Sequence, residues 1–421
     1  MGEINLDNTG SGSSVTLSSD GTSLLLDGTA IGGGGGADLY AANESSPTSQ
    51  PSATGTNAIA IGEASVSAGT RGIAINIGDT SYGALSGTTN PIAIGYQARV
   101  RANVQNSLAI GTSTDVNNAY STAVGYNAHA FGTNAQAFGS GAYAANDGAL
   151  ALGHNAQAGT RRAVSLGNSR ANGEDSFAAV ITNNTTTYGA TGASSVAIGY
   201  QAKATGAKSV AISSNTYSGS ATASGGGAVA IGDGPTASGI GSTSIGRGCT
   251  ASGTNAIAMG RSAQATAEAA VAIGYPAYSD VKGGIAFAGS GYFGSALGDA
   301  QGRMYILRVQ TTDATATELA ESSARIKVPT NGAVVFDGLI TGLESGVNSY
   351  AGWKIEGMIV NDAGTTTLVN SAITTIHNTP NWGLALTADN TNNRLAITVT
   401  GEASHNIRWV ANIRTVETIY A

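Results

Sequence analysis

The chain has 421 residues and carries little charge, since Asp, Glu, Lys and Arg make up 11% of it and the formal net charge is −7 at pH 7. Glycine accounts for 61 residues and no stretch carries a sustained 3.6-residue apolar stripe, so the composition argues against a helical protein. The lack of clustered Lys and Arg argues against nucleic acid as a partner, and the lack of an 18-residue apolar run argues against membrane insertion by a helix.

The first segment, residues 1–31, contains two short apolar runs in SVTLSSDGTSLLLDGTAI, punctuated by Asp20-Gly21 and Asp27-Gly28. Asp-Gly pairs favour tight turns, so the segment is predicted to form strand, turn, strand and turn. A compact β element suits attachment to a larger particle, although a disordered leader has the same composition. The predicted attachment residues are Val15, Leu17, Leu24, Leu25, Leu26 and Ile31.

Residues 32–56 are predicted to be a flexible linker, because they contain GGGGG at 32–36 and NESSPTSQPSATG at 43–55. Residues 1–56 also hold six carboxylates and no Lys or Arg. This acidic segment either docks on a basic surface or is simply solvated. The opening MGEINLDNTGSGSS has neither the basic nor the apolar region of a signal peptide, so a chain that works outside a cell is expected to leave by lysis, by an unusual route or as part of a particle.

From residue 57 to residue 290 the chain repeats a motif of the form apolar, small, apolar, glycine, mostly every 14 residues. The motif is regular at IAIG 59–62, LALG 150–153 and VAIG 271–274, and it is degenerate near FAAVI 177–181. A fixed period of this kind is the mark of a stacked repeat architecture. The repeats start at residues 59, 73, 92, 108, 122, 136, 150, 164, 177, 196, 210, 229, 243, 257, 271 and 285.

Each repeat predicts two short strands joined by two tight turns. The bulky residues before the glycine share one face of a strand and the small residue between them faces the other way. Small residues return three and five places after the glycine, as in Ala128 and Ala130 or Cys249 and Ala251. Stacking such coils gives a parallel solenoid with about 4.8 Å between coils. A 14-residue coil encloses little core, so the remaining apolar residues predict a symmetric oligomer.

The repeat resembles the head domain of trimeric autotransporter adhesins, through SVAIG at 195–199, AVAIG at 228–232 and 270–274, and NAIAMG at 255–260. The resemblance covers residues 57–288, and it implies a left-handed parallel β-roll assembled as a homotrimer. Rolls of this kind also occur in unrelated surface fibres, so the resemblance implies the fold more directly than the biology.

From residue 291 to residue 421 the 14-residue rhythm is replaced by aromatic and β-branched alternation between Gly, Asn and Asp clusters. This pattern predicts an antiparallel β-sandwich with Trp353 and Trp409 in its core. The segment is similar to the C-terminal domains of bacteriophage tail fibre proteins, through LRVQTTDATATEL 307–319, WKIEGMI 353–359 and LAITVTGEASHNIRWVANIRTVE 395–417.

Chemistry-bearing motifs are sparse. The four histidines, at 129, 154, 377 and 405, show no metal-ligand spacing, and Cys249 fills a slot that alanine fills elsewhere, so no metal or cofactor is predicted. The carboxylates of the repeat region are isolated, and there is neither a nucleophile elbow nor a phosphate-binding loop. The chain is therefore predicted not to be an enzyme, with a fibre-borne glycan depolymerase as a less favoured alternative.

Recognition is predicted in the loops of the C-terminal domain, because loops on a rigid β scaffold are where binding residues concentrate. Asn and Asp in loops are also ordinary turn formers, which leaves a purely structural alternative. The candidate receptor-binding residues are Asn348, Ser349, Tyr350, His377, Asn378, Asn381, Asp389, Asn390 and Asn393. Tyrosines recur just after the repeat glycine, at 96, 126, 200 and 275, where they either stack on sugars or cover the flank of the roll.

Together these features predict an all-β homotrimeric fibre with four parts: an attachment element (1–31), a linker (32–56), a β-roll shaft (57–290) and a β-sandwich tip (291–421). The resemblances imply a phage tail fibre, made in the host cytoplasm and carried extracellularly on the virion. Its expected partners are a tail or baseplate adaptor protein at the N-terminus and a host surface glycan or protein at the C-terminus, without membrane insertion. The alternative is the passenger of a bacterial trimeric surface adhesin.

Overall fold

The computed structural model describes the strands at 4–7, 14–19, 24–26 and 29–30, and then residues 50–76, 85–86, 88–101, 103–180, 187–214, 219–289, 297–320, 324–346 and 349–420. The chain divides into two compact units, Met1–Val116 and Asn117–Ala421. Within these described residues the secondary structure is strand and turn, with no helix. The prediction of an all-β protein is confirmed.

The N-terminal segment forms an antiparallel meander in sequence order. Its strands are β1 (Ile4–Asp7), β2 (Ser14–Ser19), β3 (Leu24–Leu26) and β4 (Thr29–Ala30). Of the predicted attachment residues, Val15 and Leu17 belong to β2, and the three leucines make up β3. Ile31 lies outside the described residues.

The first unit continues as a two-sheet parallel solenoid. One sheet is built from β6 (Ile59–Ile61), β8 (Ile73–Ile75), β10 (Ile92–Ile94) and β12 (Leu108–Ile110). The other is built from β5 (Ser52–Ala53), β7 (Val66–Ser67), β9 (Leu85–Ser86), β11 (Arg99–Val100) and β13 (Asp115–Val116). Equivalent residues of successive repeats face one another, as in Ile59 with Ile73.

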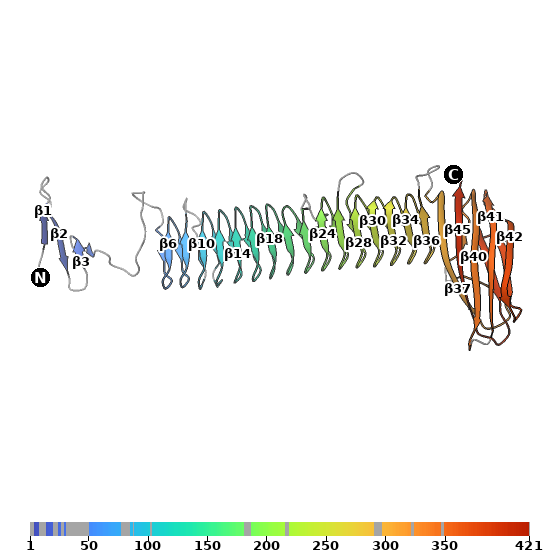
Figure 1. The fold of residues 1–421 in the computed structure, drawn as a ribbon. Helices are drawn as coiled ribbons and strands as arrows, with labels where there is room; N and C mark the ends of the chain where they lie inside the picture. The colour runs from blue at the N-terminus through green and yellow to red at the C-terminus, as the bar shows by residue number, and fades with distance from the viewer. Residues whose placement is uncertain are drawn as a thin grey trace. The chain divides into compact units, whose positions relative to one another are not determined.

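The second unit begins with the same architecture (Figure 1). Its long strands are β14 (Thr122–Val124), β16 (Gln136–Phe138), β18 (Leu150–Leu152), β20 (Val164–Leu166), β22 (Phe177–Ala179), β24 (Val196–Gly199), β26 (Val210–Ser213), β28 (Val229–Gly232), β30 (Thr243–Arg247), β32 (Ile257–Arg261), β34 (Val271–Gly274) and β36 (Ile285–Ala288). Its short strands are β15 (His129–Ala130), β17 (Tyr143–Ala144), β19 (Gln157–Ala158), β21 (Arg170–Ala171), β23 (Gly189–Ala190), β25 (Lys203–Ala204), β27 (Thr222–Ala223), β29 (Thr236–Ala237), β31 (Thr250–Ala251), β33 (Gln264–Ala265) and β35 (Tyr278–Ser279). Each repeat motif of the sequence, the degenerate one at 177 included, forms a long strand in the predicted parallel register.

Small residues, mostly alanine, line the inside of the coils and the bulky apolar residues point outward. Ala137, Ala144 and Ala151 are fully buried, whereas Leu152, next along the strand from Ala151, is 48% exposed. Cys249 takes one of the interior positions and is buried, and its Sγ accepts a hydrogen bond from Ser244 Oγ at 3.1 Å. Burial raises the pKa of the Cys249 thiol. The predicted pattern of inward small and outward large residues is confirmed.

The repeat glycines are required by close stacking as well as by backbone conformation. Gly125 has φ = +137°, and a Cβ added there would lie 2.5 Å from the carbonyl oxygen of Gly139 in the next coil. A side chain at this position would therefore meet both a strained backbone and the neighbouring coil.

The roll is followed by an antiparallel β-sandwich. Its larger sheet has the order β37 (Ala300–Thr311), β45 (Ile407–Ile419), β40 (Gly332–Glu344), β41 (Tyr350–Asp362), β42 (Thr365–Asn378). The smaller sheet pairs β43 (Gly383–Asp389) with β44 (Arg394–Thr400), which is flanked on its other edge by β38 (Thr317–Glu318) and β39 (Ile326–Lys327). The last roll strand, β36, pairs antiparallel with β37, so the parallel sheet of the roll runs directly into the larger sheet.

The sandwich core is rich in aromatic residues. Trp353 and Trp409 are buried as predicted, with ring centroids 6.0 Å apart, and Trp382 packs edge-on against Trp409 at 5.3 Å. The Trp409 indole donates a hydrogen bond to Thr311 Oγ1 at 2.9 Å, which satisfies its buried N–H. This core holds the two sheets together and fixes the loops at both ends.

Candidate binding site

The strand register separates the predicted receptor-binding residues into two groups at opposite ends of the sandwich. The last residues of β37, β40 and β42 lie at the same end of the sheet as the first residues of β41 and β45. Thr311 at the end of β37 pairs with Ile407 at the start of β45, and Leu343 near the end of β40 pairs with Tyr350 at the start of β41. We call this the open end. Ser349, Tyr350, His377, Asn378 and Asn381 lie there, whereas Asp389, Asn390 and Asn393 lie in the β43–β44 turn at the other end. Asn348 is outside the described residues.

An aromatic pair lies at the open end. The rings of Tyr350 and His377 stack with centroids 4.9 Å apart and an interplanar angle of 21°. The Tyr350 side chain is 53% exposed, and His377 Nε2 lies 2.6 Å from Thr379 Oγ1. A flat, partly exposed aromatic surface with polar groups at its rim is suited to packing against the apolar face of a sugar ring.

A cavity of about 360 Å³ lies beside this pair. None of the loop residues predicted from the sequence is among its lining residues. Its lining residues come from the ends of β37 and β40, from the loop after β40, and from the start of β45. They are Gln310, Leu343, Glu344, Ser345, Gly346, Asn406 and Arg408. A neighbouring cavity of about 590 Å³ shares Gln310 and Arg408 and adds Arg308. The open end therefore presents both hydrogen-bond donors and acceptors around a concave surface.

Glu344 is the acidic group of this cavity. Its Oε1 lies 2.5 Å from His405 Nδ1, and its backbone N–H donates to the Ser349 carbonyl at 3.0 Å. A side-chain hydrogen bond from Ser349, followed by the one from His405, lowers the pKa of Glu344 below its ordinary value. The carboxylate consequently stays ionised and acts as an acceptor, while the Arg408 guanidinium, which lines the same cavity, acts as a donor.

The residues at the other end of the sandwich are engaged in the fold. Asp389 accepts a hydrogen bond from Arg394 Nε at 2.6 Å and others from Asn392, whose side-chain hydrogen bond is the main cause that lowers the pKa of Asp389 to about 2. Asn390 Oδ1 accepts from the Thr366 backbone N–H at 2.7 Å, and Asn393 Oδ1 accepts from Thr366 Oγ1 at 2.9 Å. These side chains fasten the β43–β44 turn to β42.

Asn378 has a similar structural role at the open end. Its side chain brackets Trp382, donating to the Trp382 carbonyl at 2.8 Å and accepting from the Trp382 N–H at 2.9 Å. Asn381 adopts φ = +60°, as Asn does in tight turns. Of the predicted residues, Tyr350 and His377 are the ones that the structure joins into an exposed surface.

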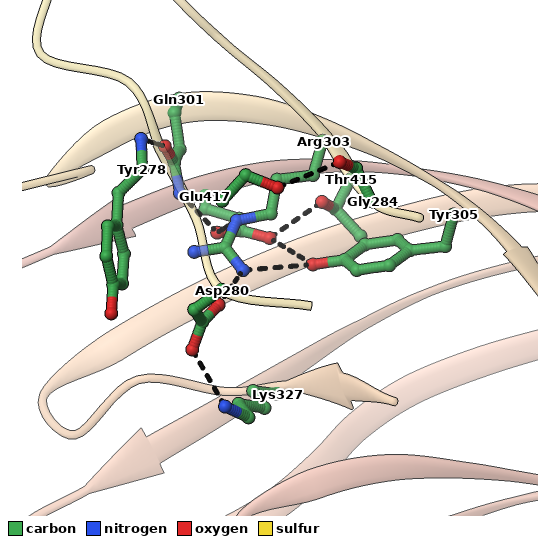
Figure 2. A network of polar contacts seen from close by, with 10 residues as sticks. Tyr278, Asp280, Gly284, Gln301, Arg303, Tyr305, Lys327, Thr415 and Glu417 are labelled. Atoms are coloured by element: carbon green, nitrogen blue, oxygen red, sulfur yellow. Dashed lines mark hydrogen bonds and ion pairs between the residues drawn. The ribbon is translucent and has the colours of Figure 1, made fainter. Parts of the chain in front are cut away.

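A second polar cluster, shown in Figure 2, joins the roll to the sandwich. Arg303 of β37 contacts Glu417 of β45 and also Asp280, which lies between β35 and β36 and in turn accepts from Lys327 Nζ at 2.8 Å. Burial opposes ionisation of Asp280, but Lys327 and Arg303 together lower its pKa. Burial, followed by the nearby Glu417 carboxylate, raises the pKa of Tyr305, so the phenol remains protonated. Each charged side chain of this cluster contacts another member of the cluster, so the cluster acts as a structural junction.

The aromatic and histidine residues of the roll do not gather into one site. Tyr126 is 64% exposed, while the guanidinium of Arg261 covers the Tyr275 ring at 4.7 Å. His129 packs against Phe131 and Tyr143, and His154 is exposed. Among the residues that the structure describes, no three His, Cys, Asp or Glu side chains are close enough to hold a metal ion. The same residues contain no helix long and apolar enough to cross a membrane.

Six segments of the chain match the YadA head domain repeat family, at residues 53–75, 102–128, 117–142, 144–169, 190–212 and 251–275. All six lie in the roll, and they agree with the resemblance drawn from the repeat motifs. No curated protein matches the chain in sequence.

Two solved structures are similar to the chain at low identity. One is the tailspike protein gp49 from Acinetobacter baumannii bacteriophage Fri1, a capsular polysaccharide depolymerase, with 11% identity, a TM-score of 0.23, and coverage of 86% of this chain and 69% of that one. The other is the tailspike protein of Acinetobacter phage vB_ApiP_P1, with 8% identity, a TM-score of 0.16, and coverage of 82% and 67%.

These comparisons correct one prediction. The sequence predicted that the chain is not an enzyme, and the similarity to a depolymerase contradicts that prediction, which is withdrawn. The prediction relied on the isolation of the repeat carboxylates in the sequence. That isolation does not exclude a catalytic pair, because such a pair is assembled from residues distant in sequence. With TM-scores this low, the likeness does not assign a reaction to this chain. The roll and its family match show a parallel β-solenoid protein with an adhesin-like repeat.

Proposed function

We propose that the chain is a homotrimeric phage tail fibre that binds a glycan or protein on the host surface through the open end of its sandwich. The N-terminal meander, with the predicted residues of β2 and β3, attaches the fibre to a tail or baseplate protein. The roll acts as the shaft. The protein is then extracellular, on the virion.

The observation that carries the proposal is the contrast between the roll and the open end. The coils have alanine interiors and engage their charged residues in neighbouring coils, as in the Arg101 and Asp115 pair at 2.6 Å. The open end instead combines the stacked Tyr350 and His377 rings with a concave polar surface around Glu344 and Arg408. Exposed aromatics beside donors and acceptors are suited to a ligand rich in hydroxyl groups.

Trimerisation would strengthen binding at such a shallow site. Three copies of a weak site on one fibre, and several fibres on one particle, raise the overall affinity without any tight individual contact. The outward apolar residues of the roll favour self-association, because a soluble monomer rarely exposes large apolar patches.

The YadA head repeat also fits the passenger of a bacterial surface adhesin, which is the second candidate function. That candidate shares the shaft and the binding tip but places the protein on a cell. The similarity of the C-terminal segment to phage tail fibre domains favours the virion.

Binding of the labelled full chain to a panel of bacterial strains, and to their purified capsular and lipopolysaccharides, tests the proposal. We expect Tyr350→Ala combined with His377→Ala to weaken binding about tenfold or more, because the stacked surface is lost. The matched control is Thr365→Ala, an exposed residue at the far end of the same strand as His377. Equal binding by the double variant and the control would contradict a receptor site at the open end.

The same samples distinguish binding from cleavage. After incubation with the chain, the length of each polysaccharide and the number of reducing ends are measured. A bound polysaccharide of unchanged length supports an adsorption fibre alone, and release of reducing ends adds depolymerisation to its function.

A further inference from the structure

The larger sheet of the sandwich has one face in the core and one face open, and the open face is strongly apolar. Side chains alternate along β45 and β40, so every second residue points away from the core. Val416 is 70% exposed and Leu339 is 60% exposed. We call this surface the outer face, and its main apolar residues are Phe287, Ile306, Val335, Leu339, Met358 and Val416.

The register makes these residues neighbours. Val416 lies directly opposite Gly302 on one side and Val335 on the other, and Val335 lies opposite Met358. Leu339 and Ile306 both flank Asn412, on opposite sides of β45. The apolar side chains therefore form one surface that crosses β37, β45, β40 and β41.

The outer face is continuous with the outward apolar column of the roll. Met259, Ile273 and Phe287 occupy equivalent positions in three successive coils, and Phe287 pairs with Gly302 of β37. The column thus passes from the parallel strands of the roll across Gly302 to Val416. At this crossing there is a hollow of about 390 Å³ lined by Phe287, Val335 and Val416, which an apolar side chain would fill.

Beside the apolar residues of the outer face the charges pair within one chain, whereas Arg308 and Arg408 lie on this face nearer to the open end. Arg414 pairs with Asp337, and Lys354 pairs with Glu356 at 2.7 Å. A partner surface that meets these apolar residues therefore needs no net charge of its own. It needs apolar residues repeated at the spacing of the coils, and the same column of another copy of this chain has that spacing.

From this we infer that the outer face of the sandwich packs against the outer faces of other copies of the chain, extending the contact between shafts into the tip. The inference rests on the self-association in the proposed function. It adds the surface through which the sandwiches of different copies contact one another. It places the apolar residues of the outer face, from Phe287 to Leu339, between copies of the chain. Tyr350 and Arg408 lie on the same face, in the row where both flank Leu343, and the inferred interface ends at Leu339, so this last row at the open end stays free for a ligand.

Cysteine labelling of the assembled full chain tests the inference. In a Cys249→Ala background, Val416→Cys places a thiol on the outer face, and Val369→Cys places one on edge strand β42. In a single chain the two valines are similarly exposed, at 70% and 57%. A maleimide probe is added to the native protein, and in denaturant both thiols should react at the same rate.

We expect the native Val416→Cys thiol to react at least about tenfold more slowly than the native Val369→Cys thiol, because an interface between copies excludes the probe. Mild oxidation should also link Val416→Cys chains into covalent dimers. Equal labelling rates in an assembled protein would overturn the inference and leave the fibre intact as a proposal. A monomeric wild-type chain in light scattering would overturn the self-association itself, and with it both proposals.

Discussion

Arg303 Nε lies 3.1 Å from Glu417 Oε2, and the two side chains are only 6% and 1% exposed. This pair ties β37 to β45, and Arg303 also donates to Asp280 beside the last roll strand, at 3.0 Å. Glu417 further accepts from Thr415 Oγ1 at 2.8 Å and from Gln301 Nε2 at 3.3 Å. The buried Glu417 carboxylate is therefore both paired with a guanidinium and hydrogen-bonded, as a buried charge must be to persist.

Glu417→Gln should destabilise the second unit by about 3 kcal/mol, because it leaves the buried Arg303 charge with less compensation. Thermal unfolding followed by circular dichroism measures the effect. The matched control is Glu268→Gln, which removes the exposed pair with Lys282 and should cost less than about 1 kcal/mol. Equal melting temperatures for the two variants would show that the junction pair does not stabilise the sandwich.

Gly125→Ala should destabilise the roll by about 3 kcal/mol, because the new Cβ would overlap the Gly139 carbonyl at a φ that L-residues avoid. Gly227→Asn is the control, since Gly227 has φ = +67° and no atom within 4 Å of an added Cβ. Asn adopts the same region elsewhere in the roll, as at Asn127 with φ = +52°, so this change should cost less than about 1 kcal/mol. Denaturant unfolding of both variants checks the difference, and similar midpoints would argue against the stacking role of Gly125.

Asp389→Asn should make the sandwich less sensitive to acid between pH 4 and pH 2. The pKa of Asp389 falls from its ordinary value of 3.8 to about 2 in the fold, so the folded state binds fewer protons than the unfolded state across this window. The contribution of the Asp389 carboxylate to the free energy of unfolding is present above the pKa of this group in the unfolded state. It is lost as the pH falls through the pKa of the group in the folded state. Melting temperatures at pH 7, 4 and 2 should show a gap between wild type and variant that narrows below pH 4. A gap that stays constant would contradict this role of Asp389.

The roll was predictable from the sequence because the residues that determine each coil lie close together in the sequence. Glycine placement, inward alanine and outward Ile, Val or Leu recur in most coils, and each coil contacts its sequence neighbours. Even the degenerate repeat at 177 forms its strand, because its neighbours on both sides fix its register.

The candidate binding surface was harder to predict because it is assembled across the sheet. Tyr350 and His377 were identified as separate loop residues, but their stacking depends on the pairing of β41 with β42. Glu344 and Arg408 lie at strand ends and resembled ordinary strand residues, so the cavity was missed. Asn390 and Asn393 were predicted to bind because they are polar loop residues, whereas their hydrogen bonds to Thr366 hold a turn in place.

The proposed function makes the sandwich the free, receptor-facing end of a virion fibre. Electron microscopy of intact particles labelled with an antibody against residues 297–420 tests it most directly. We expect gold label on fibres that project from the phage tail, at their ends away from the particle, and loss of that label in particles that lack this chain. Label on the surface of bacterial cells, with none on the particles, would contradict it and favour the adhesin.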